Sequence, residues 1–310
     1  MAGQKIWLRA ETKPAEARSA LTPTTCKALI DAGYDVTVER STQRIFDDEE
    51  FSKQGGWEKV LSRWPRGKGT LLDLEFLTDD SGRRVAAFGW SAGYAGSALA
   101  VKNWAWQLTH PNETLPGEVP YANQDRLVES VKESLEAGKK VAGKAPKILV
   151  IGALGRCGSG AVQLAKDVGI PEANIIQWDM AETARGGPFK EISHEADIFV
   201  NCIYLSAKIP PFVNVESLSA PNRTLSVICD VSADTSNPLN PIPLYDITTT
   251  FDKPTVPVSG LEAGGPPLSV ISIDHLPLLT LNDRANARVW KQAEQLFDEK
   301  VATLPKSLQA

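Results

Sequence analysis

Short apolar segments recur through the second half of the chain, each bounded by turn residues. They cover residues 147–151, 174–178, 197–201, 226–230 and 269–273. Segments of this length without a polar face are typical of parallel strands that are covered on both sides. Helical stretches lie between them, including residues 159–168. Strands that alternate with helices predict an α/β fold built on a parallel sheet.

The first part of the chain predicts a second, smaller α/β unit. Residues 5–9 and 34–39 have strand patterns, and a helix is expected from Pro23 to about Gly33, since proline favours a helix start and glycine a helix end. Further strands are expected over residues 70–77 and 84–88, and further helices over residues 92–107 and 283–303. We therefore predict two Rossmann-like domains with parallel sheets and a cleft between them.

Composition excludes several classes of function. The net charge is -5 and no dense basic stretch occurs, which argues against binding to nucleic acid. No apolar run approaches the roughly 18 residues of a membrane span. The four cysteines lie far apart without CxxC spacing, so we expect reduced thiols and no metal site. A cytoplasmic enzyme that acts on a small molecule is the resulting expectation, and the oligomeric state stays open.

A glycine-rich turn follows the segment at residues 147–151. Gly152, Gly155 and Gly158 have GxxGxxG spacing, a departure from the GxGxxG pattern of many dinucleotide sites. Glycines between a strand and a helix let the backbone approach a pyrophosphate, and the helix N-terminus attracts its charge. The alternative interpretation is a tight turn that binds nothing.

Asp179 ends the next predicted strand, somewhat further along than the usual interval of about 20 residues for an acid that holds the ribose hydroxyls. A carboxylate there would repel the extra phosphate of NADP, so NAD is the expected cofactor. The alternative role for Asp179 is an N-cap for a helix that begins at Met180.

Several motifs, in order from Ile6 to Pro277, resemble those of known enzymes. They occupy residues 9–23, 82–89, 152–160, 185–189, 201–205, 230–234 and 271–277. The first resembles the N-terminal motif of the alanine dehydrogenase and transhydrogenase superfamily. Together they look like the motifs of the fungal NAD-dependent, lysine-forming saccharopine dehydrogenases. The resemblance implies a substrate domain of residues 1–88 and 278–310, and an NAD-binding domain of residues 89–277.

The resemblance also implies roles for individual residues. NAD contacts are implied for Gly152, Gly155, Arg156, Gly158, Asp179, Arg185, Tyr204, Val231, Ile273, Asp274, His275 and Leu276. Substrate contacts are implied for Arg18, Arg83, Arg84, Phe88, Ser232 and Asp234. Catalytic roles are considered for Lys13, Glu16, Glu75 and His275. Arginines suit a substrate with carboxylate groups, because guanidinium binds carboxylate bidentately. The alternatives are solvated ion pairs, and for His275 a structural role in a turn.

One departure from the family bears on the chemistry. In the family, a sizeable segment precedes the residues that match Gly56-Trp57, and it carries the lysine and histidine regarded as the acid–base pair. Here Gly55 runs directly into Gly56, so the first domain is expected to be truncated and the cleft wider. A second contraction is expected after Pro277.

Four hypotheses remain open. The chain could be an enzyme repurposed for another C–N bond in an imine or secondary amine, or it could retain the saccharopine reaction that gives L-lysine and 2-oxoglutarate. It could instead be an inactive NAD-binding homologue with a regulatory or partner role. The shortening could also come from altered splicing or engineering.

Overall fold

The structure, a computed structural model, describes residues 5–10, 19–44, 46–52, 81–82, 84, 87–205, 207–233, 235, 237–261 and 265–280. By compactness the chain divides into two units. One consists of Met1–Phe88 with Asn282–Ala310, and the other of Gly89–Leu281. The predicted strand at residues 70–77 and the predicted helix at residues 283–303 lie outside the described residues.

The first unit begins with the predicted β-α-β arrangement. Strands β1 (Lys5–Leu8) and β2 (Asp35–Val38) pair in parallel, and helix α1 (Pro23–Asp31) joins them. The Thr22 side chain caps α1 by accepting a hydrogen bond of 3.1 Å from the Thr25 N–H. Helix α2 (Asp48–Ser52) follows. The apolar core of this unit contains Leu8, Leu21, Cys26, Leu29, Val36 and Val38.

The prediction of a strand over residues 84–88 is wrong for its last two residues. Arg84 lies in an isolated β-bridge, and Ala87 and Phe88 belong to no strand. The chain there leads directly into helix α3 (Gly89–Thr109), which starts three residues before the predicted helix. The apolar residues before Gly89 therefore lead into a helix.

The second unit contains a sheet of six strands in the order β4-β3-β5-β6-β8-β7. The strands are β3 (Ile148–Ile151), β4 (Ile175–Trp178), β5 (Ile198–Asn201), β6 (Val227–Asp230), β7 (Val256–Pro257) and β8 (Ser269–Ile271). All pairs are parallel except that of β7 with β8. This confirms the predicted parallel sheet. The short antiparallel β7 was not predicted, because two residues carry no periodic pattern.

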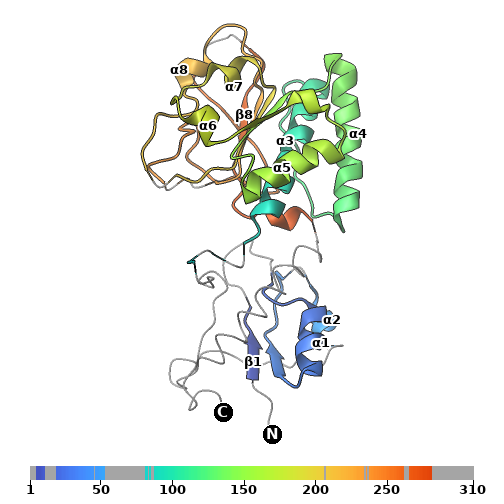
Figure 1. The fold of residues 1–310 in the computed structure, drawn as a ribbon. Helices are drawn as coiled ribbons and strands as arrows, with labels where there is room; N and C mark the ends of the chain where they lie inside the picture. The colour runs from blue at the N-terminus through green and yellow to red at the C-terminus, as the bar shows by residue number, and fades with distance from the viewer. Residues whose placement is uncertain are drawn as a thin grey trace. The chain divides into compact units, whose positions relative to one another are not determined.

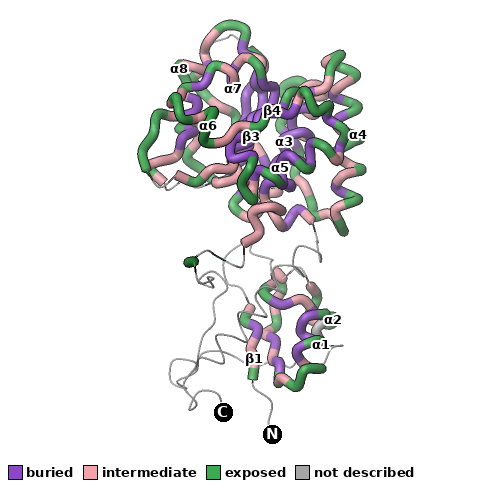
Figure 2. The backbone as a smooth tube through the Cα atoms, viewed as in Figure 1, coloured by how far each residue is buried: buried purple, intermediate pink, exposed green. Residues whose placement is uncertain are grey.

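Helices cover both faces of this sheet. Residues of α3, α4 (Gln124–Ala142) and α5 (Arg156–Asp167) share one core, and residues of α7 (Lys190–His194) and α8 (Val215–Leu218) share the other. Figure 1 shows the helices of this unit, with α3, α4 and α5 grouped together and α7 beside α8. Successive residues of a strand point to opposite faces, so Ile148 and Leu149 enter different cores. Figure 2 shows the buried strands between the helical layers. No helix among the described residues is long and apolar enough to cross a membrane.

Helix α4 was not predicted, although its sequence carries the signals of a helix. The Asn123 side chain caps its start by accepting from the Arg126 N–H at 3.0 Å, and Gly143 ends it in a left-handed conformation. Leu127, Val131 and Leu135 are spaced four residues apart and are buried on one face. This spacing is the usual pattern of an amphipathic helix.

Glycines bring α3 and α5 into backbone contact. A Cβ atom at Gly93 would lie 1.9 Å from the carbonyl oxygen of Cys157, and one at Gly160 would lie 2.0 Å from that of Trp90. Only glycine permits such approach. The close contact therefore fixes the first turn of α5 against the long helix α3.

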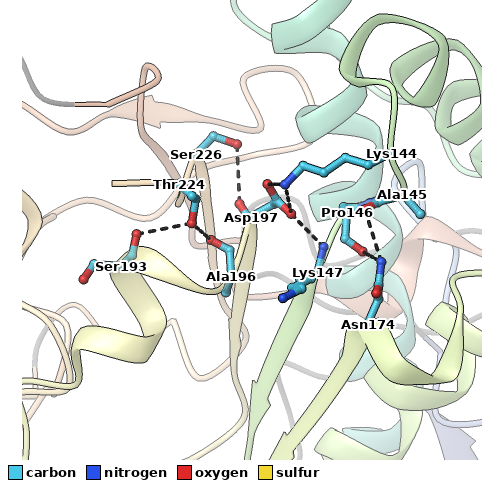
Figure 3. Close-up of polar contacts among 10 residues, drawn as sticks. All are labelled: Lys144, Ala145, Pro146, Lys147, Asn174, Ser193, Ala196, Asp197, Thr224 and Ser226. Carbon is cyan, nitrogen blue, oxygen red and sulfur yellow. Dashed lines mark hydrogen bonds and ion pairs between the residues drawn. The ribbon is translucent and has the colours of Figure 1, made fainter. Parts of the chain in front are cut away.

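Polar contacts join the strands at their amino-terminal ends (Figure 3). The buried Asp197 carboxylate accepts hydrogen bonds from the Lys147 N–H at 2.8 Å and from Lys144 Nζ at 3.0 Å. The Thr224 hydroxyl donates to the Ala196 carbonyl oxygen at 2.9 Å. These contacts tie the starts of β3, β5 and β6 together, at the edge of the sheet opposite the glycine-rich turn.

Candidate functional site

The strand order locates the edge at which a ligand could bind. The chain runs from β3 to its neighbour β4 and then crosses to β5 on the other side of β3. In open parallel sheets, ligands bind outside the carboxyl ends of the strands at such a reversal. The turn after β3 and the loop after β5 meet there, because a Cβ atom at Gly152 would lie 2.9 Å from Cγ1 of Ile203.

Geometry requires glycine at two positions of the turn. Gly152 has a φ of +82°, a conformation that side chains rarely adopt. A Cβ atom at Gly158 would lie 2.1 Å from the Gly152 carbonyl oxygen. Gly155 has an ordinary φ of -74° and donates its N–H to the same oxygen at 3.0 Å. The turn is therefore a compact backbone cradle at the start of α5.

The N-terminus of α5 is suited to an anion. Gly155 is its N-cap residue, no side chain caps it, and its first turn contains no acidic residue. A helix N-terminus carries a partial positive charge and directs N–H groups outward. The exposed Arg156 adds a full positive charge at the first position of the helix. Phosphate groups are the ligands that such a helix start commonly binds.

Asp179 lies beside the glycine turn and also caps a helix. Its Oδ1 accepts from the Met180 N–H at 2.9 Å, at the start of α6 (Met180–Thr183), so the alternative role as N-cap is correct. Its Oδ2 accepts from the Leu154 N–H at 3.1 Å. A carboxylate has about four acceptor positions, so ribose hydroxyls could still donate to it. The helix-cap role and the ribose-binding role are thus compatible.

Two residues that donate their N–H groups to this acid have exposed apolar side chains. Leu154 is 82% exposed, and Met180 is 79% exposed. Tyr204, which follows β5, is 65% exposed. The chemistry of these side chains suits the flat, apolar faces of a base or a nicotinamide ring.

Arg185 is held near the end of β4. Its Nη2 lies 2.8 Å from Oε1 of Glu191, and its guanidinium lies 5.3 Å from the ring centroids of Trp178 and Phe189. Burial acts to raise the pKa of Glu191. A backbone hydrogen bond and the contacts with Arg185 outweigh that effect and lower it. The guanidinium is therefore anchored beside the strand that leads to Asp179.

Buried polar side chains end the next two strands. Asn201 ends β5, Asp230 ends β6, and both are fully buried. The Asp230 carboxylate accepts from Asn201 Nδ2 at 3.0 Å, from the Ser232 hydroxyl at 2.6 Å and from the Tyr245 hydroxyl at 2.6 Å. Burial and then the Asp230 charge raise the pKa of Tyr245, so its phenol keeps the proton that it donates. Val231, between two of these residues, is half-buried.

Three cysteines gather behind the glycine turn. Cys157 lies in the first turn of α5, Cys202 follows β5, and Cys229 lies within β6. A hydrogen bond with Cys157, and then burial, raise the pKa of Cys202. Burial and then the Asp230 charge raise that of Cys229. All four cysteines of the chain are free, as predicted, and Cys202 and Cys229 are neutral thiols near pH 7, which are poor nucleophiles.

The predicted residues after β8 differ in exposure. Ile273 and Leu276 are buried in the core that α3 shares, so a ligand could reach only their backbone. Asp274 is exposed. The half-buried His275 contacts the Phe251 ring edge-on, with the ring centroids 5.6 Å apart. His275 precedes the short helix η4 (Leu276–Leu279), without a side-chain capping bond.

The predicted substrate and catalytic residues are described only in part. Lys13, Glu16, Arg18, Glu75, Arg83 and Asp234 lie outside the described residues. Arg84 is exposed and Phe88 is half-buried, both in the first unit. Ser232 lies in the second unit, where its hydroxyl hydrogen points to Asp230. Across the described part of the chain, no group of three or more His, Cys, Asp or Glu side chains could hold a metal ion.

Comparison with known proteins identifies the family. The family "Alanine dehydrogenase/PNT, N-terminal domain" matches residues 7–56. A relative from Emericella nidulans, named saccharopine dehydrogenase [NAD(+), L-lysine-forming], is 67% identical over 375 aligned positions, covering 99% of this chain and 100% of the relative. The chain belongs to this saccharopine dehydrogenase family. A relative of the same name from Neurospora crassa is 54% identical over 99% of both chains.

A solved structure supports the α/β fold. An L-alanine dehydrogenase superposes with a TM-score of 0.55 and 14% identity, covering 95% of this chain and 87% of that one. At this identity the likeness concerns the fold alone. It confirms the α/β fold class that the sequence predicts for this chain.

The alignment also bears on the predicted missing segment. It spans 375 positions with the Emericella relative, whereas this chain has 310 residues. The relative therefore has residues without a counterpart here. The family match at the N-terminus ends at residue 56, at the Gly55-Gly56 junction where the sequence predicts the gap.

No role was predicted from the sequence for Asn201, Asp230 or Tyr245. A signal existed for the first two, because each is a polar residue that ends an otherwise apolar strand. No pattern singles out Tyr245, which reaches Asp230 only through the folding of the loop after β6.

Proposed function

We propose that this chain is an NAD(H)-dependent oxidoreductase that acts on the C–N bond of a secondary amine or imine derived from amino acids. The observation that carries the proposal is 67% identity to a protein named saccharopine dehydrogenase [NAD(+), L-lysine-forming], in an alignment that covers 99% of this chain and 100% of the relative. Saccharopine, and lysine with 2-oxoglutarate, are accordingly the first substrates to test.

The residues at the carboxyl edge of the sheet fit the cofactor. The glycine cradle leaves no side chain between the backbone and a pyrophosphate, and the start of α5 with Arg156 would hold its charge. Asp179 would accept from the adenosine ribose hydroxyls and repel a 2′-phosphate. Tyr204 and Val231 would also contact the cofactor, and residues 273–276 would lie near its nicotinamide end. When bound, the cofactor supplies reversible two-electron exchange with the carbon beside the substrate nitrogen.

The arginines of the N-terminal motifs would hold the substrate. Saccharopine carries three carboxylates, and Arg18, Arg83 and Arg84 could bind them bidentately. In this proposal Phe88, Ser232 and Asp234 complete the contacts to the substrate. The substrate would thus be oriented by charge at its carboxylates, which leaves the nitrogen to groups that handle protons.

Proton transfer is where this chain departs from its family. Oxidation of a secondary amine and hydrolysis of the imine need one group to accept the amine proton and another to direct water. Each such group contributes about 10²–10⁴-fold to the rate. The family's lysine and histidine have no counterpart, so Lys13, Glu16, Glu75 or His275 would have to act in their place.

This gap favours a second candidate function, which is the reduction of a preformed imine. Such a substrate needs less acid–base assistance than saccharopine, because no water has to be activated. The shortened first unit would then accept a different amino-acid-derived molecule. The alignment with the Emericella relative supports this candidate. It is longer than this chain, so the relative has residues that are missing here.

The test combines binding and turnover in one sample. NADH binding is followed by fluorescence, and NADH consumption is measured first with lysine plus 2-oxoglutarate and then with cyclic imines. Turnover with lysine and 2-oxoglutarate supports the saccharopine reaction, and turnover with imines alone supports the second candidate. Binding without any turnover contradicts both and indicates an NAD-binding protein without chemistry. Lys13→Ala and Glu75→Ala then show whether either residue handles protons.

A further inference from the structure

We propose that Asp230 is a positioning residue for the dinucleotide, since its buried carboxylate fixes the two loops that contact the cofactor. This inference rests on the proposed function, because it assumes a dinucleotide at the carboxyl edge of the sheet. Asp230 itself contacts no ligand in this account. It acts through the residues to which it is bound.

The environment of Asp230 is unusual for a buried charge. No ion pair recorded within the described residues involves it, although its side chain is fully buried. Four donors compensate the charge instead. Beyond the side chains of Asn201, Ser232 and Tyr245, the Ser232 backbone N–H donates to Oδ1 at 3.1 Å. A carboxylate held by several donors is rigid, and each donor is fixed in return.

The first loop that Asp230 fixes is the one after β5. Asn201 donates to Asp230 and also binds both backbone groups of Ile203, with 3.2 Å from its Nδ2 to the Ile203 oxygen and 3.2 Å from the Ile203 N–H to its Oδ1. Ile203 packs against the backbone of Gly152. A continuous set of contacts thus runs from the Asp230 carboxylate through Asn201 and Ile203 to the glycine cradle. Tyr204 is the residue after Ile203 in the same loop.

The second loop is the one after β6. Asp230 binds the Ser232 N–H and hydroxyl, and the Val231 N–H donates to the Asn201 carbonyl oxygen at 2.9 Å. Val231 is therefore held between two residues that the carboxylate fixes. Both proposed cofactor contacts in these loops, Tyr204 and Val231, depend on the same buried charge.

A matched pair of substitutions separates positioning from stability. Tyr245→Phe removes a hydroxyl that donates to the Asp230 carboxylate at 2.6 Å. Tyr94→Phe removes a hydroxyl that donates to the Asp167 carboxylate at 2.8 Å, at the last residue of α5 and thus at the far end of that helix from the glycine turn. Burial raises the pKa of both tyrosines, so both phenols are neutral donors.

The experiment measures NADH dissociation constants by fluorescence titration and melting temperatures for the full chain. Asp230→Asn is expected to raise the Kd about tenfold or more, and Tyr245→Phe about threefold to tenfold, the range that corresponds to the net contribution of one ordinary hydrogen bond. Tyr94→Phe is expected to lower the melting temperature without changing the Kd. If turnover is present, the KM for NADH should rise by a larger factor than kcat falls.

Two results would overturn the proposal. One is an unchanged Kd for Tyr245→Phe, and the other is an equal rise in Kd for Tyr245→Phe and Tyr94→Phe. If Asp230→Asn does not fold, Tyr245→Phe decides the question alone. Failure of the proposed function is distinct, because it is measured on the unaltered protein, which would then either not bind NADH or bind it without turnover.

Discussion

Replacement of Gly158 by alanine should displace the glycine turn and weaken the binding of NADH. The new Cβ atom would lie 2.1 Å from the Gly152 carbonyl oxygen and 2.6 Å from the Ala153 Cα, whereas ordinary contacts begin at 3.4 Å. The turn or the helix must therefore move by more than 1 Å. Both contact atoms belong to the backbone, so no side-chain rotation can relieve the clash.

The magnitude follows from that displacement. Overpacking of this kind costs about 1–3 kcal/mol, and each kcal/mol lowers the melting temperature of a domain of this size by roughly 2–4 °C. Backbone N–H groups that move by about 1 Å lose their hydrogen bonds to a charged pyrophosphate, and one such bond contributes roughly 1.5–3 kcal/mol, which corresponds to up to about 100-fold in Kd. We therefore expect Gly158→Ala to raise the Kd for NADH by about 100-fold, measured by fluorescence titration beside thermal unfolding.

Gly143→Ala is the matched control. Gly143 ends α4 with a φ of +69°, and a Cβ atom there would meet nothing within 4 Å. The left-handed conformation costs an alanine roughly 1–2 kcal/mol. Its melting temperature should fall while its Kd for NADH stays that of the unaltered protein. Wild-type NADH affinity in Gly158→Ala, or equal weakening in both variants, would refute the reasoning.

Three further predictions concern separate parts of the chain. Asp179→Asn should weaken NADH binding and narrow the preference over NADPH, which parallel titrations would show; an undiminished preference would contradict the assigned role. Lys102→Met leaves the half-buried Glu118 without its cation, so the free energy of unfolding, measured in urea, should fall by about 1–3 kcal/mol, and an unchanged value would count against this role. Burial raises the pKa of Cys26 from 9.0 to about 12, so the thiol loses its proton at a lower pH in the unfolded chain than in the folded one. The free energy of unfolding should therefore fall as the pH rises from 9 towards 12. The free energy of unfolding, measured in urea below and above pH 9, should decline less in Cys26→Ala than in the unaltered protein.

The elements of the second unit were predictable where apolar periodicity and turn residues agree. The segment at residues 197–201 is bounded by turns and became β5. The sequence predicted that this helix begins at Ser159, three residues after the start of α5. The reason is that glycines such as Gly158 are typical of turns, although Gly158 lies within the helix. Its small size serves the close approach to Gly152, which a one-dimensional pattern cannot show.

The candidate site was predictable only for contacts that are local in sequence. The glycine turn is such a feature, and Asp179 follows it at a recognisable interval. The Asp230 cluster is not, because its members come from β5, β6 and the loop that carries Tyr245. Their association depends on strand order, which places β5 beside β6 and is set by packing of the whole sheet.

Transfer of isotope from the cofactor to a product tests the central claim most directly. The protein would be incubated with NADH that carries deuterium at the reactive nicotinamide carbon, together with lysine and 2-oxoglutarate, and in parallel with cyclic imines. Mass spectrometry should find one deuterium on the carbon beside the amine nitrogen of a product. Binding of NADH without labelled product from any of these substrates would contradict the proposed oxidoreductase activity on a C–N bond.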